Sequence, residues 1–530
     1  MRNRMKDFFG IGLFSGLQSL PGSGCAGRPA FSGWRLGWRP GCACSRGVGM
    51  VLLLCLGYPA PPVANAEWSQ FRGRNSTGVV ETSPLPVRFG PHRNLVWRAA
   101  VGPGQSSPIL TRDRIFLSSV EEDRLWVICL DRSSGDLLWK KEVPRPRSEV
   151  MHRANGPASP TPVTDGTNVY AFFGDFGLIS FDSEGRERWR LPLGPFVNPM
   201  GQAASPVLAD GRVLMICDQE SGSFFVAVDQ MTGEVLWRVE RPGFTRGFST
   251  PVLYRPKGGG LQALISGSHQ LTAYSVDSGE EIWWVRGLTW QMKSTPVIDR
   301  DMLYLNGWAG GADDSQREEV PSFADFLSER DSDGDQRLSQ QEIAGLQLRW
   351  NFDRLDLDRT GFLEDRDWRI YRAKRSARNG ALGIRLGGEG DMTASNLLWR
   401  YQRTLPNVPS PLLYQGILYL MKEGGILTAL DPSSGSVLKQ DRIREALGTY
   451  YASPVAGDGK IFAVSHEGRV SVIRAGADWQ VLSVNDLGSE CSATPAISEG
   501  RLYIRTREFL YCFGEHRPPE QPSNDRKGRR

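Results

Sequence analysis

The chain has 530 residues, of which 40% are hydrophobic and 23% charged, a composition typical of a globular domain protein. The formal net charge is +4, but residues 1–66 hold seven Lys or Arg and one Asp, a net of +6. The remainder is therefore near −2. This balance excludes a basic nucleic-acid-binding protein.

Residues 1–66 read as an export leader. A basic stretch precedes an apolar run from Val48 to Tyr58, and Ala64-Asn-Ala66 is a small-x-small cleavage site. The alternative is a membrane anchor, but the run is too short to span a bilayer. Leu54 precedes Cys55 where a lipoprotein signal needs a small residue, which disfavours a lipid anchor. We therefore expect an exported protein, periplasmic or extracellular, with no transmembrane segment in the mature chain.

One pattern recurs along the rest of the chain. A Ser-Pro or Thr-Pro step opens a short apolar run, a second run follows, and a turn of the form Asp-x-x-Ser/Thr-Gly-x-x-x-Trp comes next. Successive steps lie about 40 to 50 residues apart, with one longer gap, and such a period of short strands is typical of a β-propeller. Eight steps predict an all-β, eight-bladed propeller of four-stranded antiparallel blades. The steps begin at Ser107, Ser159, Ser205, Thr250, Thr295, Ser410, Ser453 and Thr494.

The turn at the end of each repeat has a clear physical reading. In the first repeat it runs from Asp131 to Gly135 and leads to Trp139. Glycine allows the positive φ of the turn, and the Asp carboxylate accepts turn N–H groups. The Trp is expected to stack on the next blade and bury a large aromatic surface there. Lys439 replaces this Trp in the sixth repeat, and Trp479 is displaced in the seventh.

The last repeat ends after three strands, near Phe513. The missing outer strand is available at the front of the chain, in the segment from Asn94 to Arg98. Strand exchange between the two ends would close the ring and leave no free sheet edge. We therefore assign the ring to residues 67–311 and 391–514, and we expect the tail, 515–530, to be disordered.

The long gap interrupts the fifth repeat and contains two acidic loops. Carboxylates at positions 1, 3, 5 and 12 of the first loop, with Ser at position 9, match an EF-hand calcium loop. The second loop has Thr at position 5 and Asp at position 12, and is expected to bind calcium more weakly. The predicted ligands are Asp331, Asp333, Asp335, the Arg337 carbonyl, Ser339 and Glu342 in the first loop, and Asp356, Asp358, Thr360, Phe362, Glu364 and Asp367 in the second.

The predicted EF-hand insert spans residues 312–390. Gln336 stands where the first loop usually has glycine, which costs on the order of 1 kcal/mol. Leu338 and Leu363 hold equivalent positions and are expected to form the short β contact of paired loops, with one helix from Gln341 to Leu355 shared between them. The alternative to metal binding is that the two loops are solvated acidic turns. If a metal binds, it either holds the insert together or acts as a sensor. The expected core of the insert is Phe323, Phe326, Ile343, Leu346 and Trp368.

These repeats resemble the pyrroloquinoline-quinone-like (PQQ-like) propeller family with its tryptophan-docking motif. Quinoprotein alcohol dehydrogenases and the propeller lipoprotein of the bacterial outer-membrane assembly machinery share that architecture. The segment from Trp68 to Gly73 is also similar to the opening of exported bacterial members. The resemblance to the dehydrogenases implies a PQQ cofactor covered by a disulfide between adjacent cysteines, with a calcium ion and a catalytic Asp beside it. This chain has no adjacent Cys pair, and no clamp or catalytic residue of that site can be matched.

Other candidate groups have two readings each. Asp175 and Asp218 either face the channel or have a turn-capping or solvent-facing role, and the second reading is favoured. The five His residues show no metal-ligand spacing. Buried free thiols are favoured over a disulfide for the cysteines outside the leader, which are Cys129, Cys217, Cys491 and Cys512.

Two functions remain open on the sequence. The first is an exported, monomeric, calcium-binding propeller that binds an unknown protein or small-molecule ligand on one propeller face. The second is a divergent quinone-dependent oxidoreductase, with PQQ as its cofactor.

Overall fold

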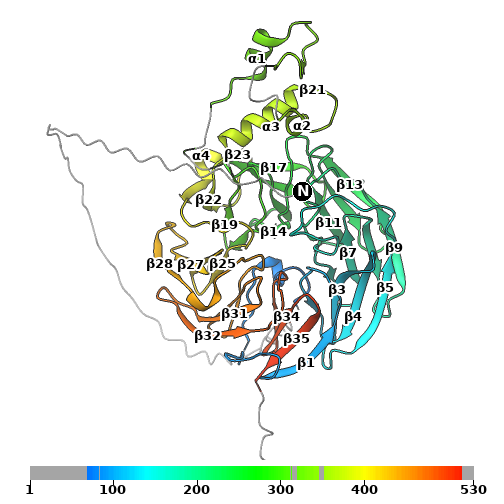
Figure 1. Ribbon diagram of the computed structural model, residues 1–530, viewed down its shortest axis with the longest axis vertical. Coiled ribbons are helices and arrows are strands. Elements are labelled where there is room, and N and C mark those ends of the chain that lie inside the picture. Colours follow the sequence, from blue (N-terminus) through cyan, green and yellow to red (C-terminus); the bar gives the residue numbers. More distant parts are fainter. Residues whose placement is uncertain are drawn as a thin grey trace, which may run out of the picture. The chain divides into compact units, whose positions relative to one another are not determined.

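The computed structural model describes residues 68–515 except 83, 311, 313–314, 316–318 and 345–350. The predicted leader and the tail from 516 lie outside the described residues. The described chain forms a ring of eight antiparallel four-stranded sheets, which confirms the predicted eight-bladed propeller (Figure 1). Within these residues no helix has the length and apolar character needed to cross a membrane.

The first four blades follow one another along the chain. Blade 4 has an additional short strand, β23 (Gly390–Asp391), which pairs in parallel with its outer strand. From the innermost strand outward, the blades are β2 (Ile109–Leu110), β3 (Arg114–Glu121), β4 (Arg124–Asp131) and β5 (Leu137–Val143); β6 (Val163–Thr164), β7 (Val169–Phe173), β8 (Gly177–Phe181) and β9 (Glu187–Pro192); β10 (Val207–Ala209), β11 (Arg212–Cys217), β12 (Phe224–Asp229) and β13 (Val235–Glu240); and β14 (Val252–Tyr254), β15 (Gln262–Ser266), β16 (Gln270–Ser275) and β17 (Glu281–Arg286).

The other four blades include the interrupted blade 5 and the closing blade 8. They are β18 (Val297–Asp299), β19 (Met302–Gly307), β22 (Gly380–Arg385) and β24 (Leu397–Tyr401); β25 (Leu412–Tyr414), β26 (Ile417–Lys422), β27 (Ile426–Leu430) and β28 (Val437–Arg442); β29 (Val455–Gly457), β30 (Lys460–Val464), β31 (Arg469–Arg474) and β32 (Gln480–Asp486); and β33 (Ala496–Ser498), β34 (Arg501–Arg505), β35 (Phe509–Gly514) and β1 (Leu95–Ala100).

The remaining elements are short. They are η1 (Arg74–Ser76), α1 (Phe323–Arg330), β20 (Leu338–Ser339), α2 (Phe352–Leu355), β21 (Phe362–Leu363), α3 (Asp365–Ser376), α4 (Thr393–Asn396) and η4 (Arg444–Ala446).

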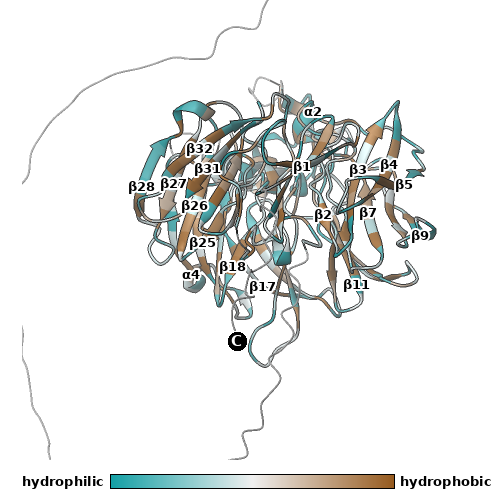
Figure 2. Cartoon of the chain, turned by 90° about the horizontal axis from the view of Figure 1, so that it is seen from below, coloured by the Kyte–Doolittle hydropathy of each residue, from teal (hydrophilic) through white to brown (hydrophobic). Residues whose placement is uncertain are grey.

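Apolar side chains gather on the middle strands of the blades, where neighbouring sheets face one another. Strands such as β7 and β8 are buried along their whole length, whereas the outer strand β28 is largely exposed. Figure 2 shows the same gradient, with brown middle strands and a hydrophilic β28. The hydrophobic core therefore lies between the blades, as the layered packing of sheets requires.

A closed circle of hydrogen bonds joins the blades around the central channel. The backbone N–H of each opening residue donates to the hydroxyl oxygen of the opening residue in the next blade, at 2.9 to 3.3 Å. The circle is completed by Thr494, whose N–H donates to the Ser107 hydroxyl. We call this set the hydroxyl ring; its members are Ser107, Thr161, Ser205, Thr250, Thr295, Ser410, Ser453 and Thr494.

The hydroxyl ring corrects one predicted opening. In blade 2 the member is Thr161 of Thr161-Pro162, and the predicted step Ser159-Pro160 lies just before it. Both steps have the same local chemistry, so spacing alone could not separate them. The Ser159 hydroxyl instead donates to the Gln105 side chain.

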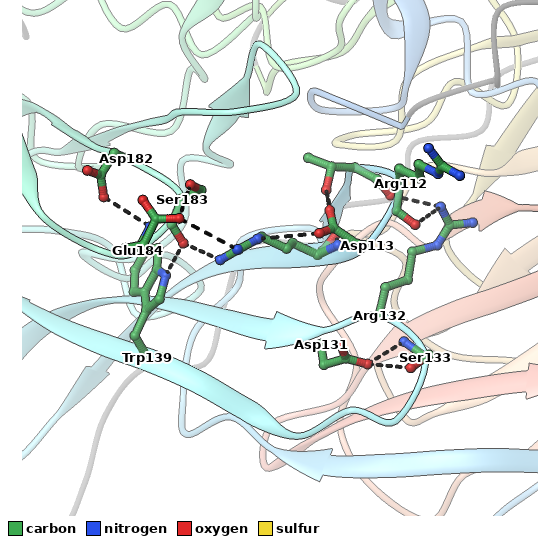
Figure 3. Close-up of polar contacts among 11 residues, drawn as sticks. Arg112, Asp113, Asp131, Arg132, Ser133, Trp139, Asp182, Ser183 and Glu184 are labelled. Atoms are coloured by element: carbon green, nitrogen blue, oxygen red, sulfur yellow. Dashed lines mark hydrogen bonds and ion pairs between the residues drawn. The ribbon is translucent and has the colours of Figure 1, made fainter.

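Tryptophan docking joins five of the eight pairs of neighbouring blades. In Figure 3, the Trp139 indole N–H of blade 1 donates to the Ser183 carbonyl in the turn of blade 2, at 2.8 Å. A Cβ on Gly185 of that turn would lie 2.9 Å from the indole, so the turn has room only for glycine. The docked pairs are Trp97 on Gly135, Trp139 on Gly185, Trp189 on Gly233, Trp237 on Gly279 and Trp399 on Gly435.

The other blade contacts are built differently. Trp283 is fully buried, but its indole N–H donates to Gln262 of its own blade. Lys439 takes the place of a docking Trp and donates to the carbonyl of Trp479, whose ring lies under its ammonium at 4.8 Å. Between blades 7 and 8, Phe89 from the N-terminal segment packs on Phe513 with ring centroids 4.8 Å apart.

The closing strand is placed as predicted. β1 pairs antiparallel with β35, with Trp97 opposite Cys512, so the two ends of the described chain share blade 8. The segment before β1, which begins at Trp68, runs across one end of the channel and contacts the inner strands of two blades. The Leu110 N–H donates to the Trp68 carbonyl, and Asn75 forms two hydrogen bonds with the Leu253 backbone. The N-terminal segment therefore closes that end of the channel.

The insert is shorter than predicted. The predicted range, 312–390, includes β22, which pairs with both β19 and β24 and is the third strand of blade 5. Asn379 joins the two ends of the insert, because its side chain bonds both backbone groups of Ala309 and its N–H donates to the Ala312 carbonyl. The chain thus returns to the ring at Asn379.

We predict that Ser453→Ala lowers the free energy of unfolding by roughly 1–3 kcal/mol, because the buried Ser410 N–H loses its acceptor. Ser221→Ala is the matched control, since the Ser221 side chain makes no hydrogen bond within the described residues. Urea unfolding measures both variants. Equal stability of the two would show that the hydroxyl ring does not hold the blades together.

We also predict that the ring folds without the insert. Replacing residues 314–376 by a short Gly/Ser linker keeps Asn379 and β22, and the ends of the cut already lie together. This variant should melt cooperatively. A longer deletion that also removes β22 should not fold, because it opens blade 5. Loss of soluble expression in the shorter deletion would mean that the insert is part of the core of the ring.

Candidate functional site

The central channel widens at one end into a cavity of about 450 Å³. All eight members of the hydroxyl ring line it, and Phe71 of the N-terminal segment closes it from below. We call this cavity the basin. Its volume falls within the range of small-molecule sites, which are usually concave and few in number.

The basin opens on the face of the ring that carries the insert. Each inner strand begins at this face, and the antiparallel second strand returns to it. The insert follows the second strand of blade 5, β19, so it leaves the ring on the same side. Trp308 and Gly310, at the start of the insert, are part of the basin wall.

Lys293 is the only Lys or Arg among the described residues of the basin wall. Its ammonium donates to the Asn407 side-chain oxygen at 2.7 Å and to the Trp308 carbonyl at 3.3 Å. Burial lowers the pKa of Lys293 to about 8, and the charge of Glu423 opposes this shift. An ammonium has three hydrogens, so one remains for a ligand in the basin.

Neutral polar and aromatic side chains form most of the remaining wall. Gln291 is 7% exposed, and its amide makes no hydrogen bond within the described chain. Trp308, Tyr451 and Phe248 supply aromatic surface to the same wall. Among the described residues, the wall contains no Asp, Glu or Cys.

This wall does not fit a calcium ion paired with a quinone cofactor. Calcium needs several oxygen ligands, usually including carboxylates. A dehydrogenase of this kind also needs an acid–base group at the reacting carbon. The basin wall within residues 68–515 offers hydroxyl and amide groups, one ammonium and the His152 imidazole, but no carboxylate to hold a calcium ion.

Asp175 and Asp218, the two predicted channel candidates, lie outside the basin wall. Asp175 is fully buried and accepts from the Arg145 guanidinium at 2.7 Å. Asp218 forms a buried two-point ion pair with Arg241, at 2.8 and 3.1 Å. Neither is solvent-facing, and the main partner of each is a buried or half-buried arginine from another loop, so the favoured reading does not describe their role. Buried pairs of this kind stabilise a structure only when both partners are present.

A second cavity of about 540 Å³ adjoins the basin above blades 7, 8 and 1. Gln105, Ala154, Tyr451 and Ser492 line both spaces, so the two are neighbours. We call the second cavity the side cleft. Its wall carries the charged residues Arg153, Glu490, Arg505 and Arg507, together with His466.

The first acidic loop of the insert brings three predicted ligands together. Carboxylate oxygens of Asp331, Asp333 and Glu342 lie within 4.8 Å of one another, an arrangement that could hold a metal ion. Backbone N–H groups of Ser332 and Ser339 donate to Glu342, which lowers its pKa to about 2. The carboxylate is therefore ionised over the whole physiological range, as a cation ligand must be.

The second loop groups Asp356, Asp358 and Asp367 in the same way. Asp367 is 2% exposed. Its pKa is raised to about 6, mainly by burial and also by the negative charge of Asp358. A bound cation would relieve the repulsion between the buried Asp367 and the exposed Asp358. Gln336 and Gly361 occupy the sixth positions of the two loops with φ of 62° and 85°, so Gln336 adopts the backbone of the glycine it replaces.

The remaining predicted ligands lie outside the two groups. Asp335 accepts from the Arg337 backbone and guanidinium, and the Arg337 guanidinium lies 4.1 Å above the Phe362 ring of the other loop. Ser339 donates its hydroxyl to Glu342. In the second loop, the Thr360 hydroxyl donates to the Phe362 carbonyl, and Glu364 is the N-cap of α3.

The two loops pair as expected. Leu338 of β20 lies opposite Leu363 of β21, which confirms the predicted β contact. Trp368 stacks on Phe326 with ring centroids 4.3 Å apart, and both belong to the buried cluster of the insert. The predicted shared helix from Gln341 to Leu355 is not continuous: residues 341–344 form turns, and among its described residues only α2 at its end is α-helical. Leu346 lies outside the described residues.

Helix α3 connects the second loop to the ring. Arg366, beside the predicted ligand Asp367, donates to the carbonyls of Glu220 and Pro242 on blade 3. Further along α3, the Lys374 ammonium lies 4.3 Å above the Trp290 ring. Trp290 belongs to the same connecting segment as the basin residues Gln291 and Lys293. One segment therefore contacts both the insert and the basin.

All four cysteines of the described chain are buried free thiols, as favoured from the sequence. Burial raises the pKa of Cys129 and Cys491 to about 12 and that of Cys512 to about 11. They are therefore core residues and not reactive groups.

Comparison with known proteins identifies related families and folds. The family described as "Outer membrane protein assembly factor BamB" matches residues 91–226 and 220–515. No curated protein sequence matches the chain.

Many solved structures are similar, among them the following three. BamB from Moraxella catarrhalis is 12% identical, with a TM-score of 0.49 over 79% of this chain and 99% of that one. Quinohemoprotein alcohol dehydrogenase from Comamonas testosteroni is 12% identical, with a TM-score of 0.52 over 86% and 82%. A europium-containing methanol dehydrogenase is 10% identical, with a TM-score of 0.51 over 85% and 98%. At this identity the similarity concerns the fold alone.

We predict that the mature chain takes up calcium and that Glu342→Gln weakens uptake at the first loop by roughly 10- to 100-fold, because a position-12 ligand is lost. Glu329→Gln on α1 is the matched control, since Glu329 is exposed and outside the loops. Isothermal titration calorimetry measures both. Unchanged uptake in Glu342→Gln would contradict the assignment of the first loop.

Proposed function

The chain belongs to the family described as outer membrane protein assembly factor BamB, and from this premise we propose that it is an exported binding protein. Its site is the basin together with the adjoining side cleft, and its ligand is a small molecule or a segment of a protein partner. The insert on the same face binds calcium.

The observation that carries this proposal is the chemistry of the basin wall. Eight hydroxyls of the hydroxyl ring, several amides, one imidazole (His152) and one ammonium converge there, which suits recognition by hydrogen bonds. Within the described wall there is no carboxylate, thiol or paired acid and base that could move a proton or attack a substrate. Besides the Tyr451 phenol, His152 and Lys293 are the titratable side chains of the described wall, and neither is paired with a carboxylate there, so the wall favours binding over catalysis.

Export is proposed on two grounds. The leader pattern of residues 1–66 is that of a secretory signal. The family is described as an outer membrane protein assembly factor, which supports a place outside the cytoplasm. We place this protein in the periplasm or outside the cell, and as a monomer.

Calcium is proposed to stabilise the insert. Asp331, Asp333 and Glu342 would hold one ion, and the buried group around Asp367 a second. Because Arg366 fixes α3 to blade 3, an ion beside Asp367 would also hold the insert in place on the ring. The metal would then fix the shape of the face on which the basin opens.

A quinone-dependent oxidoreductase is the second candidate, favoured by the shared fold with quinohemoprotein alcohol dehydrogenase over 86% of this chain. The absence of carboxylates from the described basin wall counts against it. We therefore rank binding above catalysis.

We predict that Ala203→Trp, which fills the basin from its wall, abolishes ligand binding. Ala100→Trp on the exposed edge of β1 is the control for the added indole. Thermal-shift screening against saccharides, nucleotides, carboxylic acids and short peptides identifies ligands of the native protein, and the two variants then test their site. Binding that survives in Ala203→Trp would place the site elsewhere.

Dye reduction after incubation with PQQ and calcium is the complementary measurement. We expect no turnover of alcohols or sugars above a heat-killed control. Turnover that Ala203→Trp removes would promote the oxidoreductase candidate.

A further inference from the structure

The hydroxyl ring leaves a specific hydrogen-bonding capacity at the bottom of the basin. A hydroxyl has one O–H donor and two acceptor lone pairs. Each ring oxygen accepts the N–H of the neighbouring opening residue. None of the eight hydroxyls donates to another group of residues 68–515. The hydrogens of eight buried hydroxyls are therefore left for whatever occupies the basin, and the floor is rich in donors.

Lys293 adds a positive charge to this donor surface. Its two partners, Asn407 and the Trp308 carbonyl, are both neutral. No carboxylate of the described chain lies within ion-pair distance of its ammonium, and Glu423 acts on it only from further away. The side-chain NH₂ of Asn407 is also without a described acceptor, since that amide uses its oxygen for Lys293. The charge is thus held in a concave, partly desolvated site where it acts strongly on a ligand.

The side cleft extends the positive surface outward from the basin. Arg505 is 1% exposed in its wall, and its Nε–H has no acceptor within the described chain. Its two terminal nitrogens bond only neutral oxygens, at Ser106, Ser118 and Gly102. Arg153 and Arg507 lie in the same wall.

One carboxylate opposes these arginines in the side cleft. Glu490 lies 3.6 Å from Arg507 and 4.0 Å from His466. A single acid among three arginines leaves the cleft with an excess of positive charge. An anion that enters the basin therefore passes a surface that attracts it.

We propose that the basin binds a small organic anion, held through a carboxylate, sulfate or phosphate group by Lys293 and the hydroxyl ring without a metal ion. This inference rests on the proposed binding function and names the class of its ligand. An oxyanion accepts several hydrogen bonds at once, which matches a floor made of donors. The cavity of about 450 Å³ limits the ligand to small-molecule size. The aromatic wall of Trp308 and Tyr451 then receives the uncharged part of the ligand.

The test compares charged probes with a neutral one on the full mature protein. Calorimetry at constant ionic strength uses phosphate, sulfate, citrate and glucuronate, with glucose as the neutral counterpart of glucuronate. We expect saturable binding of at least one oxyanion, unchanged by EDTA, and no binding of glucose. The probe that binds identifies which oxyanion is recognised.

Variants then assign the site. Lys293→Gln should weaken oxyanion binding by roughly tenfold or more, because a charge-assisted hydrogen bond is lost. Lys257→Gln, at an exposed lysine in the first loop of blade 4, is the matched control and should bind as the native protein does. Gln291→Glu places a negative charge in the wall without changing its size and should also abolish binding, which provides a second route if Lys293→Gln does not fold.

Four outcomes would overturn the inference. They are no saturable binding of any oxyanion, binding that requires calcium, equal affinity in Lys293→Gln and the native protein, and glucose binding as tight as glucuronate. A further outcome is a neutral ligand that binds the native protein and Lys293→Gln equally well but fails to bind Ala203→Trp. That result would support the proposed binding function and refute the anionic class of its ligand. Oxyanion binding that survives in Ala203→Trp would refute both.

Discussion

The circle of hydrogen bonds between neighbouring Ser and Thr openings is the constraint on which the rest of the structure depends. Each blade supplies one backbone donor and one hydroxyl acceptor, so the circle is complete only when all eight blades are present. Tryptophan docking holds the outer edges at five blade contacts, but the inner circle is continuous. It also forms the floor of the basin. The interaction that closes the ring therefore determines the chemistry of the cavity at its centre.

Features that depend on local sequence could be predicted. The spacing of Ser/Thr-Pro steps predicted the blades, and the incomplete last repeat predicted β1 as its fourth strand. The errors arose where local signals were duplicated or missing. Ser159 and Thr161 both precede proline, and only the contact across blades shows which one belongs to the ring. β22 is rich in glycine and follows the insert without a turn signal, so the sequence did not separate it from the insert.

The same distinction between signals in local sequence and contacts across blades applies to the calcium loops and the basin. An EF-hand loop is contiguous, and the two groups of carboxylates lie where the spacing placed them. The basin, in contrast, takes one or a few residues from each blade, and no spacing along the chain predicts it. The segment around Phe71 carries a family resemblance, but only the structure shows that it closes the channel. Trp290, Gln291 and Lys293 connect the two sites, since one contacts the insert and the others line the basin.

The central claim is that the channel binds anions and that metal ions bind only in the insert. A crystal structure of the mature protein grown with terbium in place of calcium and selenate in place of sulfate tests this directly by anomalous scattering. The account predicts terbium beside Asp331 and Asp367, and selenate above Phe71 within hydrogen-bond distance of Lys293. Terbium in the basin would contradict it.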